Sequence, residues 1–378
     1  MNRQEGGLLT SLENLIVFTK YFGVHSLQYD TQLRKFQICK NLKLLKILWF
    51  TIVIIFNIYV SKLLTEAIPR KIFILHVGYY IYRDLYLMVL YSIIICDHIY
   101  EETTETVLNQ LIQVQERLQQ NDRIKILKLV LLTIICTKFG IDIFGVYKFT
   151  KTDGDISWDT ILVIFNFVYI SFIENLTELR FLLIFSILPV YFKHLSQDFN
   201  LSFTNPTKCN KIVKTHQELC WLARKINKTF SVPFLFLMGY YLSNMIINII
   251  QNYYHMVFLN TAVNIFDIFQ FSLALIMLFS LIIVANQCMT QANEFKKHVC
   301  KVLSKNGTNS NRKNLYAYGL QMFHEDLQIN AAGFFVIEIG LIFAMISAAG
   351  TYVVIILQFL YSENQNVRSK NFEIFTNG

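Results

Sequence analysis

Seven residues near the C-terminal end of the sequence recur at steps of three or four positions along an apolar run. The set, mostly small or polar, is Gly340, Ala344, Ser347, Thr351, Ile355, Gln358 and Ser362. Such steps place residues on one face of a helix. The amide of Gln358 would leave donors and an acceptor unpaired if it faced hydrocarbon. This face therefore either packs on another helix through its small residues or lines a water-filled path for ions.

Two other pairs of residues have a spacing that could support chemistry. Glu174 and Glu178 lie four positions apart and could act as acid and base, but no second polar cluster accompanies them. We expect them on a solvated or lysine-paired cytosolic helix. His216 and Cys220 have the spacing of zinc ligands, yet further ligands do not follow at suitable spacing, so we expect packing and no metal.

The motifs of common enzyme classes are not found in this sequence. It contains no G-x-G-x-x-G, no P-loop, no G-x-S-x-G and no H-E-x-x-H. We therefore expect neither an enzyme nor a bound cofactor.

The composition is that of a membrane protein. Of 378 residues, 54% are hydrophobic and 16% are charged, and the mean hydropathy is +0.42. A soluble protein is about one quarter charged. The first forty residues are polar and mixed, without the apolar core of a secretory signal.

Seven stretches are apolar and long enough to cross a bilayer. They are, with approximate bounds, Leu44–Leu64, Ile72–Cys96, Leu127–Phe149, Thr160–Phe192, Val232–Tyr254, Val263–Ala285 and Gly333–Leu360. Internal repeats and a separate soluble domain are not recognisable in the sequence. We predict an all-α fold, a seven-transmembrane helical bundle.

Basic residues predict the orientation of this bundle. With a cytosolic N-terminus, 24 of the 34 Lys and Arg residues lie in cytosolic segments, six lie outside and four lie within spans. This asymmetry predicts an extracellular C-terminus. It also accounts for the net charge of +8, so nucleic acid is not an expected partner. All seven cysteines lie outside the predicted extracellular loops, so no extracellular disulfide is expected.

The orientation divides the chain into four parts. Residues 1–41 form a cytosolic N-terminal segment with short amphipathic pieces, and residues 42–332 form a six-span bundle with cytosolic helix extensions. Residues 333–360 form the seventh helix, and residues 361–378 form an extracellular tail.

Polar and aromatic residues gather in the outer halves of several spans. We predict a ligand pocket from the set His76, Tyr79, Tyr80, Arg83, Asp142, Trp158, Phe165, Tyr169, Asn244, Asn248, Gln251 and Asp267. Small-molecule pockets combine aromatic walls with a few placed polar groups. Helix packing with amide hydrogen bonds is the alternative for each residue taken singly. Arg83 within a span needs a partner, and we predict Asp142, either as a fixed structural ion pair or as part of the pocket.

The end of the sequence resembles a known family. Thr351 and Tyr352, five apolar residues, then Gln358 and Phe359 resemble the C-terminal signature of insect gustatory receptors, and Ala332-Gly333-Phe334-Phe335 resembles the lead-in to it. The segment from His216 to Phe230 more weakly resembles the intracellular helix of that family, whose subunits meet mainly through such cytosolic extensions.

The resemblance implies a ligand-gated, non-selective cation channel in the plasma membrane of a sensory neuron dendrite. Four subunits, as a homotetramer or as a heterotetramer with related receptors, would line a pore for cations with their seventh spans. Thr351, Val354, Ile355 and Gln358 would form pore and gate. Sugar receptors of the family often carry an acidic residue after Thr-Tyr, and Val353 stands there instead, which favours a non-sugar tastant.

Two other classes of function have seven or more spans. A polytopic transporter would show inverted repeats and broken helices, and neither is visible. A metabotropic receptor of the G-protein-coupled type would show an arginine box after span three, N-P-x-x-Y in span seven and an outer disulfide, all missing here. The predicted orientation is also the reverse of that class.

Overall fold

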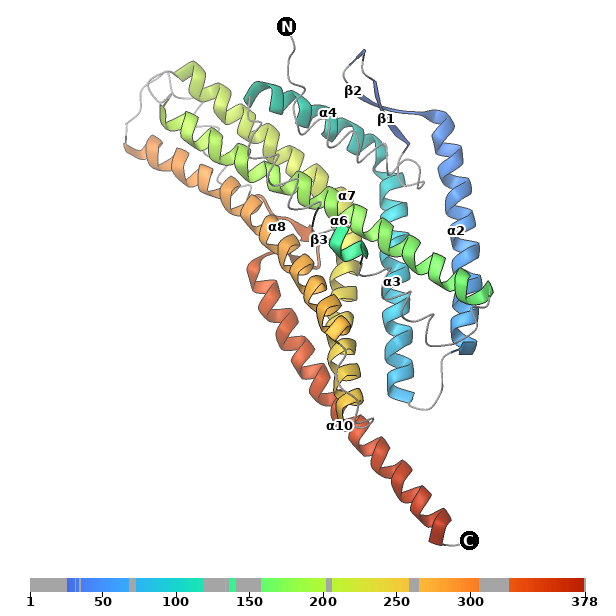
Figure 1. Cartoon of the computed structure of the whole chain (residues 1–378). Coiled ribbons are helices and arrows are strands. Elements are labelled where there is room, and N and C mark those ends of the chain that lie inside the picture. Colours follow the sequence, from blue (N-terminus) through green and yellow to red (C-terminus); the bar gives the residue numbers. More distant parts are fainter. Residues whose placement is uncertain are drawn as a thin grey trace.

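The computed structural model describes residues 26–30, 32, 33, 35–67, 73–118, 133, 136–140, 158–201, 206–257, 265–305 and 326–376. Long helices dominate these residues (Figure 1). They are α2 (Lys40–Ala67), α3 (Phe73–Ile99), α4 (Glu101–Leu118), α6 (Trp158–Leu201), α7 (Pro206–Val257), α8 (Ile265–Lys305) and α10 (Ile339–Thr376). The strands are β1 (Leu27–Asp30), β2 (Lys35–Ile38), β3 (Asn330–Ala331) and β4 (Phe335–Val336), paired as two antiparallel hairpins.

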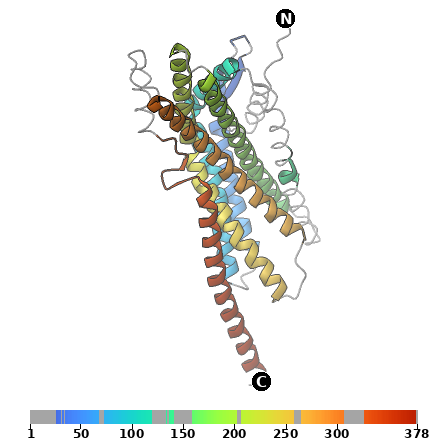
Figure 2. The same ribbon diagram turned by 90° about the vertical axis from the view of Figure 1, so that its left-hand side faces the viewer.

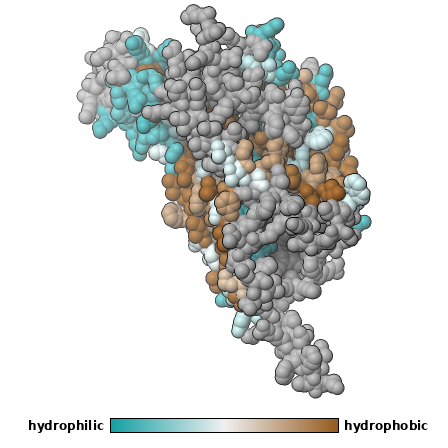
Figure 3. Space-filling model, viewed as in Figure 1, coloured by the Kyte–Doolittle hydropathy of each residue, from teal (hydrophilic) through white to brown (hydrophobic). Residues whose placement is uncertain are grey.

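The predicted spans reappear as helices in the described residues, except at the start of the seventh. Five helices, α2, α6, α7, α8 and α10, are apolar and long enough to cross a membrane. Helix α3 coincides with the second predicted span. The third, Leu127–Phe149, lies mostly outside the described residues. Apolar surface lies over the middle of the molecule, and polar surface lies over one end (Figure 3).

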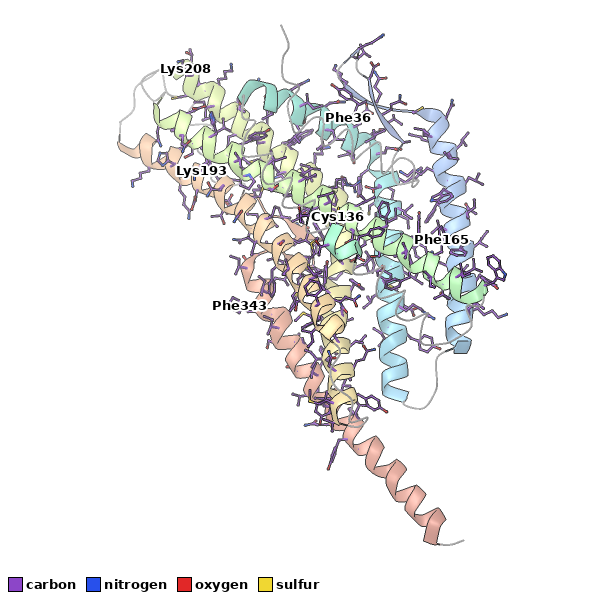
Figure 4. The ribbon with its side chains drawn as sticks, in the orientation of Figure 1. Phe36, Cys136, Phe165, Lys193, Lys208 and Phe343 are labelled. Carbon is purple, nitrogen blue, oxygen red and sulfur yellow. The ribbon has the colours of Figure 1, made fainter. Side chains whose placement is uncertain are left out.

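Three helices extend far beyond the length of a span. Helices α6, α7 and α8 have 44, 52 and 41 residues, and a bilayer core about 30 Å thick needs only about 20. Lys193 and Lys208 lie at the end where the extensions gather (Figure 4). This end is the cytosolic side in the predicted orientation.

Aromatic rings fill the core between the extensions of α6 and α7. The ring of Phe181 lies 4.2 Å from that of Phe234 and 5.6 Å from that of Phe230, each edge-on. Phe181 is fully buried, and Phe230 and Phe234 nearly so. Edge-to-face aromatic pairs add about 0.5–1.5 kcal/mol to the burial itself, so this part of the fold is well fixed.

The N-terminal segment contains a hairpin where the sequence predicted only short amphipathic pieces. Strand β2 packs against α4. There the side chain of Asn109 forms the two backbone hydrogen bonds that a neighbouring strand would otherwise form. It accepts from the backbone N–H of Phe36 at 2.8 Å and donates to the carbonyl of Phe36 at 3.0 Å. The side chain of Phe36 is completely buried.

The seventh helix begins at Ile339 rather than at Gly333. Residues 330–336 form the β3–β4 hairpin, whose turn contains Ala332 with φ 52° and Gly333 with φ 79°. Phe334 N–H donates to the carbonyl of Ala331 at 3.0 Å and closes the turn. Left-handed backbone costs a non-glycine residue about 1–2 kcal/mol, so Gly333 is suited to its position and Ala332 is strained. The helix continues to Thr376, past the predicted end of the span, and extends beyond the other helices (Figure 2).

Candidate ion pathway and ligand site

The predicted stripe on the last helix is exposed along its whole length. All seven of its residues, from Gly340 to Ser362, are exposed in the single chain. The opposite face is packed: Met345, Ala349, Val353 and Leu360 are buried. Seven residues that share a face and lie opposite the packed one remain available to line water.

Large apolar side chains lie on both sides of the stripe. Ile346 and Val354 flank it on one side, and Tyr352 and Phe359 on the other, and each is about half exposed or more. Phe343 is 70% exposed and points away from the bundle (Figure 4). Lipid or further copies of the helix could pack against these apolar flanks. Lipid offers no hydrogen-bond partner to the amide of Gln358.

The β3–β4 hairpin connects this helix to α7 and α8 through side-chain amides. Asn293 of α8 donates to the carbonyl of Leu327 at 3.2 Å and accepts from its N–H at 3.1 Å. Asn227 of α7 accepts from the N–H of Asn330 at 3.3 Å. Leu327, Ile329 and Ala331 are buried. These contacts attach the segment that precedes α10 to both α7 and α8.

The predicted pocket is only partly within the described residues. Asp142 lies outside them, as do the side chains of His76, Tyr79 and Asp267, so the ion pair of Arg83 with Asp142 stays a prediction. Arg83 forms an ion pair with Asp84 of its own helix, with Nη2 and Oδ1 2.7 Å apart. Its guanidinium carbon lies 4.8 Å from the centre of the Tyr80 ring.

The remaining predicted pocket residues differ in where they point. Tyr169 is buried and accepts a hydrogen bond from Trp49 Nε1 at 2.9 Å. Asn248 Nδ2 donates to the carbonyl of Asn244 at 2.8 Å, and both side chains are half-buried. Gln251 is exposed.

Two aromatic members of the predicted set do not face the interior. Trp158 is 80% exposed, and Phe165 is 61% exposed. The ring of Phe165 lies 6.2 Å from that of Phe56 on the outer surface (Figure 4). Both lie on an exposed face of α6, so neither belongs to the proposed pocket.

A buried aromatic cluster was only partly predictable from the sequence. Tyr86 of α3 stacks on Tyr240 of α7, with ring centres 5.1 Å apart, and lies 5.6 Å from Phe167 of α6. Beside Phe167, the buried Asn166 Oδ1 has no hydrogen-bond partner among the described residues. The tyrosine-rich outer half of α3 was visible, but its partners on α6 and α7 depend on long-range packing.

A buried charge cluster joins three segments. Lys138 Nζ lies 3.0 Å from Glu178 Oε2 and 3.4 Å from Glu174 Oε1, and the Tyr241 hydroxyl donates to Glu178. The expected lysine partner is present, but the glutamates are buried rather than solvated, with exposures of 3% and 1%. The signal in the sequence was Lys138 itself, which lies inside the third predicted span. A charge inside a span needs a partner of opposite charge.

The expected packing role of His216 is confirmed. Its ring stacks on Phe295 with centres 4.3 Å apart, and Nε2 donates to the carbonyl of Ala292 at 3.1 Å. Cys220 Sγ lies 3.7 Å from Nδ1. Burial lowers the pKa of His216 to about 3, so the ring is neutral. The described part of the chain contains no cluster of three residues able to bind a metal.

Comparison with known proteins identifies the family. Residues 12–363 match the family model described as 7tm Chemosensory receptor. The insect olfactory receptor OR5 from Machilis hrabei, solved in complex with eugenol, is similar with a TM-score of 0.69 and 13% identity, over 93% of this chain and 98% of that chain. A second structure of OR5 gives a TM-score of 0.68 and 12% identity over the same shares. No curated protein matches the chain.

These findings agree with the geometry described above. At 12–13% identity the solved structures show a common fold, the seven-helix bundle predicted from the spans. The family model extends over nearly the whole length and includes the stripe, the hairpin and the charge cluster. The chain belongs to the 7tm chemosensory receptor family.

Proposed function

We propose that the protein is a gustatory receptor that acts as a ligand-gated, non-selective cation channel, opened by a small-molecule tastant that is not a sugar. The main support is the stripe of α10, which is exposed and lies opposite the packed face of the same helix. Four copies around an axis would turn the stripe to the centre and place the apolar flanks between neighbouring helices or against lipid. The assembly would be a homotetramer or a heterotetramer with related receptors, in the plasma membrane of a sensory neuron dendrite.

Within such a pore, Ile355 would hold the closed gate and Gln358 would contact permeating ions. A ring of apolar side chains excludes water and blocks ions, whereas amides replace part of the hydration shell of a cation. Thr351 lies one turn before Ile355 on the stripe, whereas Val354, which the sequence placed in the pore, lies on the flank where neighbouring helices would meet. The Thr351 hydroxyl donates to the carbonyl of Ser347 at 3.0 Å, so the hydroxyl oxygen can still accept from pore water.

The tastant would bind among the outer halves of the first six spans. Tyr80 and Arg83 supply an aromatic ring and a cation, and Tyr86 and Tyr240 supply a buried aromatic wall. Asn166 offers a buried carbonyl oxygen. A movement of α7 or α8 on binding would reach the start of α10 through the contacts of Asn227 and Asn293 with the segment that precedes this helix.

Purified receptor in a planar lipid bilayer should conduct Na⁺ and K⁺ when an agonist from a small-molecule panel is added, without any G protein. The panel should contain non-volatile bitter compounds, sugars and eugenol, and we expect responses to bitter compounds. Transport without unitary currents would favour a transporter. A response only in cells that supply a G protein would favour a metabotropic receptor.

The same recordings test the pocket. Tyr80→Ala and Arg83→Ala should raise the half-maximal agonist concentration about ten- to a hundredfold at unchanged maximal current, because each loses about 1–3 kcal/mol of contact. Phe165→Ala, on the outer surface, is the matched control. Unchanged potency in both pocket variants, with the channel still conducting, would move the ligand site elsewhere.

A further inference from the structure

A cavity of about 430 Å³ lies between α4 and the cytosolic extension of α7, a volume within the usual range for small-molecule sites. Its polar lining consists of Gln110, Gln113, Lys214, Gln217, Glu218 and Trp221. The buried side chains of Val114 and Leu222 form its apolar floor. It shares no residue with the ion pathway or with the proposed tastant pocket.

The polar groups at this cavity are available to a ligand. Within the described part of the chain, the side chains of Gln110, Gln113 and Gln217 make no hydrogen bond, and the ammonium group of Lys214 makes no ion pair. Each glutamine offers two donors and one acceptor. Three amides and an ammonium group that converge on one cavity leave many hydrogen-bonding positions for a bound molecule.

Positive charge predominates along this face of α7. Lys211, Lys214, Lys225 and Lys228 recur with Trp221 at helical spacing, so they share one face. The Lys225 ammonium lies 5.1 Å from the centre of the Trp221 ring. Glu218 is the carboxylate in the lining. Lys214 is the lysine in the lining, and the three other lysines of this face add positive charge next to the cavity, which favours an anionic ligand.

The chemistry of the lining narrows the class of that ligand. Lysine binds phosphate as a point charge, and glutamine amides bind hydroxyl groups through their donors and acceptor. The half-exposed ring of Trp221 offers a flat apolar surface for the C–H face of a saturated ring. A lysine stripe alone is expected of any cytosolic helix, but the amide-lined cavity with its aromatic wall is not.

We propose that this cavity is a cytosolic binding site for a phosphorylated cyclic polyol. The same chemistry occurs in the head group of an inner-leaflet phosphoinositide and in a free inositol phosphate. Basic pockets on the cytosolic side of membrane helices bind such head groups. The proposal does not depend on channel activity.

Binding to the full-length receptor in phosphatidylcholine nanodiscs tests the site. The probes are inositol trisphosphate, short-chain phosphatidylinositol bisphosphate and, as control, unphosphorylated inositol. We expect saturable binding of at least one phosphorylated probe and none of inositol. Binding of both phosphorylated probes, or of one alone, identifies the source of the head group.

Variants assign the binding to this cavity. Lys214→Gln should weaken the binding of the phosphorylated probe at least about tenfold, because a hydrogen bond to a charged group contributes about 1.5–3 kcal/mol. Trp221→Ala should also weaken it, because the aromatic wall of the cavity is lost. Lys297→Gln, which removes an exposed lysine from the cytosolic part of α8, should change it less than twofold. No saturable binding of any probe, or equal losses in Lys214→Gln and Lys297→Gln, would overturn the proposal.

Discussion

Replacing Lys138 by methionine should remove most of the receptor from the cell surface. The ammonium group lies within 3.4 Å of both Glu174 and Glu178, and the two carboxylates are almost completely buried. Without the lysine they repel each other away from water. Breaking a buried ion pair by removing one partner costs about 3–5 kcal/mol, a large part of the 5–15 kcal/mol that stabilises a typical protein.

Surface biotinylation and thermal stability in detergent measure this effect. Lys62→Met, which removes an exposed lysine from α2, should behave as wild type. The triple variant Lys138→Met, Glu174→Gln, Glu178→Gln carries no charge at the site and should recover much of the loss, since neutral replacements of a whole cluster are often tolerated. Normal stability of the single variant would show that the cluster does not hold these segments together.

Ile355→Ser should raise the ligand-independent current severalfold. The residue lies on the exposed stripe with an exposure of 41%, and in a tetramer four serines would replace a ring of apolar side chains. A polar ring is wetted, so the closed pore would leak. Ile346→Ser is a matched control, because Ile346 is 47% exposed on the flank of the same helix. It should leave the basal current unchanged, and an equal increase in both variants would contradict the assignment of the gate.

Gln358→Glu should increase the permeability to calcium relative to sodium. The stripe outside this position contains no carboxylate, and Glu338 precedes the helix, so strong selectivity for divalent ions is not expected of the wild type. Four carboxylates in place of four amides would attract divalent cations. The reversal potential in asymmetric calcium and sodium solutions measures the change. Substitutions of Tyr352 and Phe359, on the other flank, should act on folding and assembly instead.

Features that depend on local periodicity could be predicted from the sequence. The stripe of α10 and the spans that the structure describes follow from helical spacing and apolar length. The lysine-paired glutamates were expected, but not their burial, because Lys138 and Glu178 lie 40 positions apart and their meeting depends on how helices pack. The inward or outward direction of Phe165 also depends on packing, and its aromatic character alone did not decide it.

The hairpins were missed for a different reason. Residues 331–336 have no polar side chain and are continuous with the last span, so the predicted helix begins within them, at Gly333. The left-handed backbone at Ala332 and Gly333 forms a turn instead. Asn227 contacts Asn330 at its start, and Asn293 contacts Leu327 in the segment before it. An alanine in this conformation gives no signal in the sequence.

Reaction of introduced cysteines tests whether α10 lines the ion pathway with its stripe. Thr351→Cys and Gln358→Cys should be modified by a charged, membrane-impermeant thiol reagent in the open state, and the current should fall as they react. Ile346→Cys on the flank should not affect the current, and the unsubstituted receptor serves to measure any reaction of its own cysteines. Block through Ile346→Cys but not through the stripe positions would exclude the stripe from the ion pathway and leave it as a surface for helix packing.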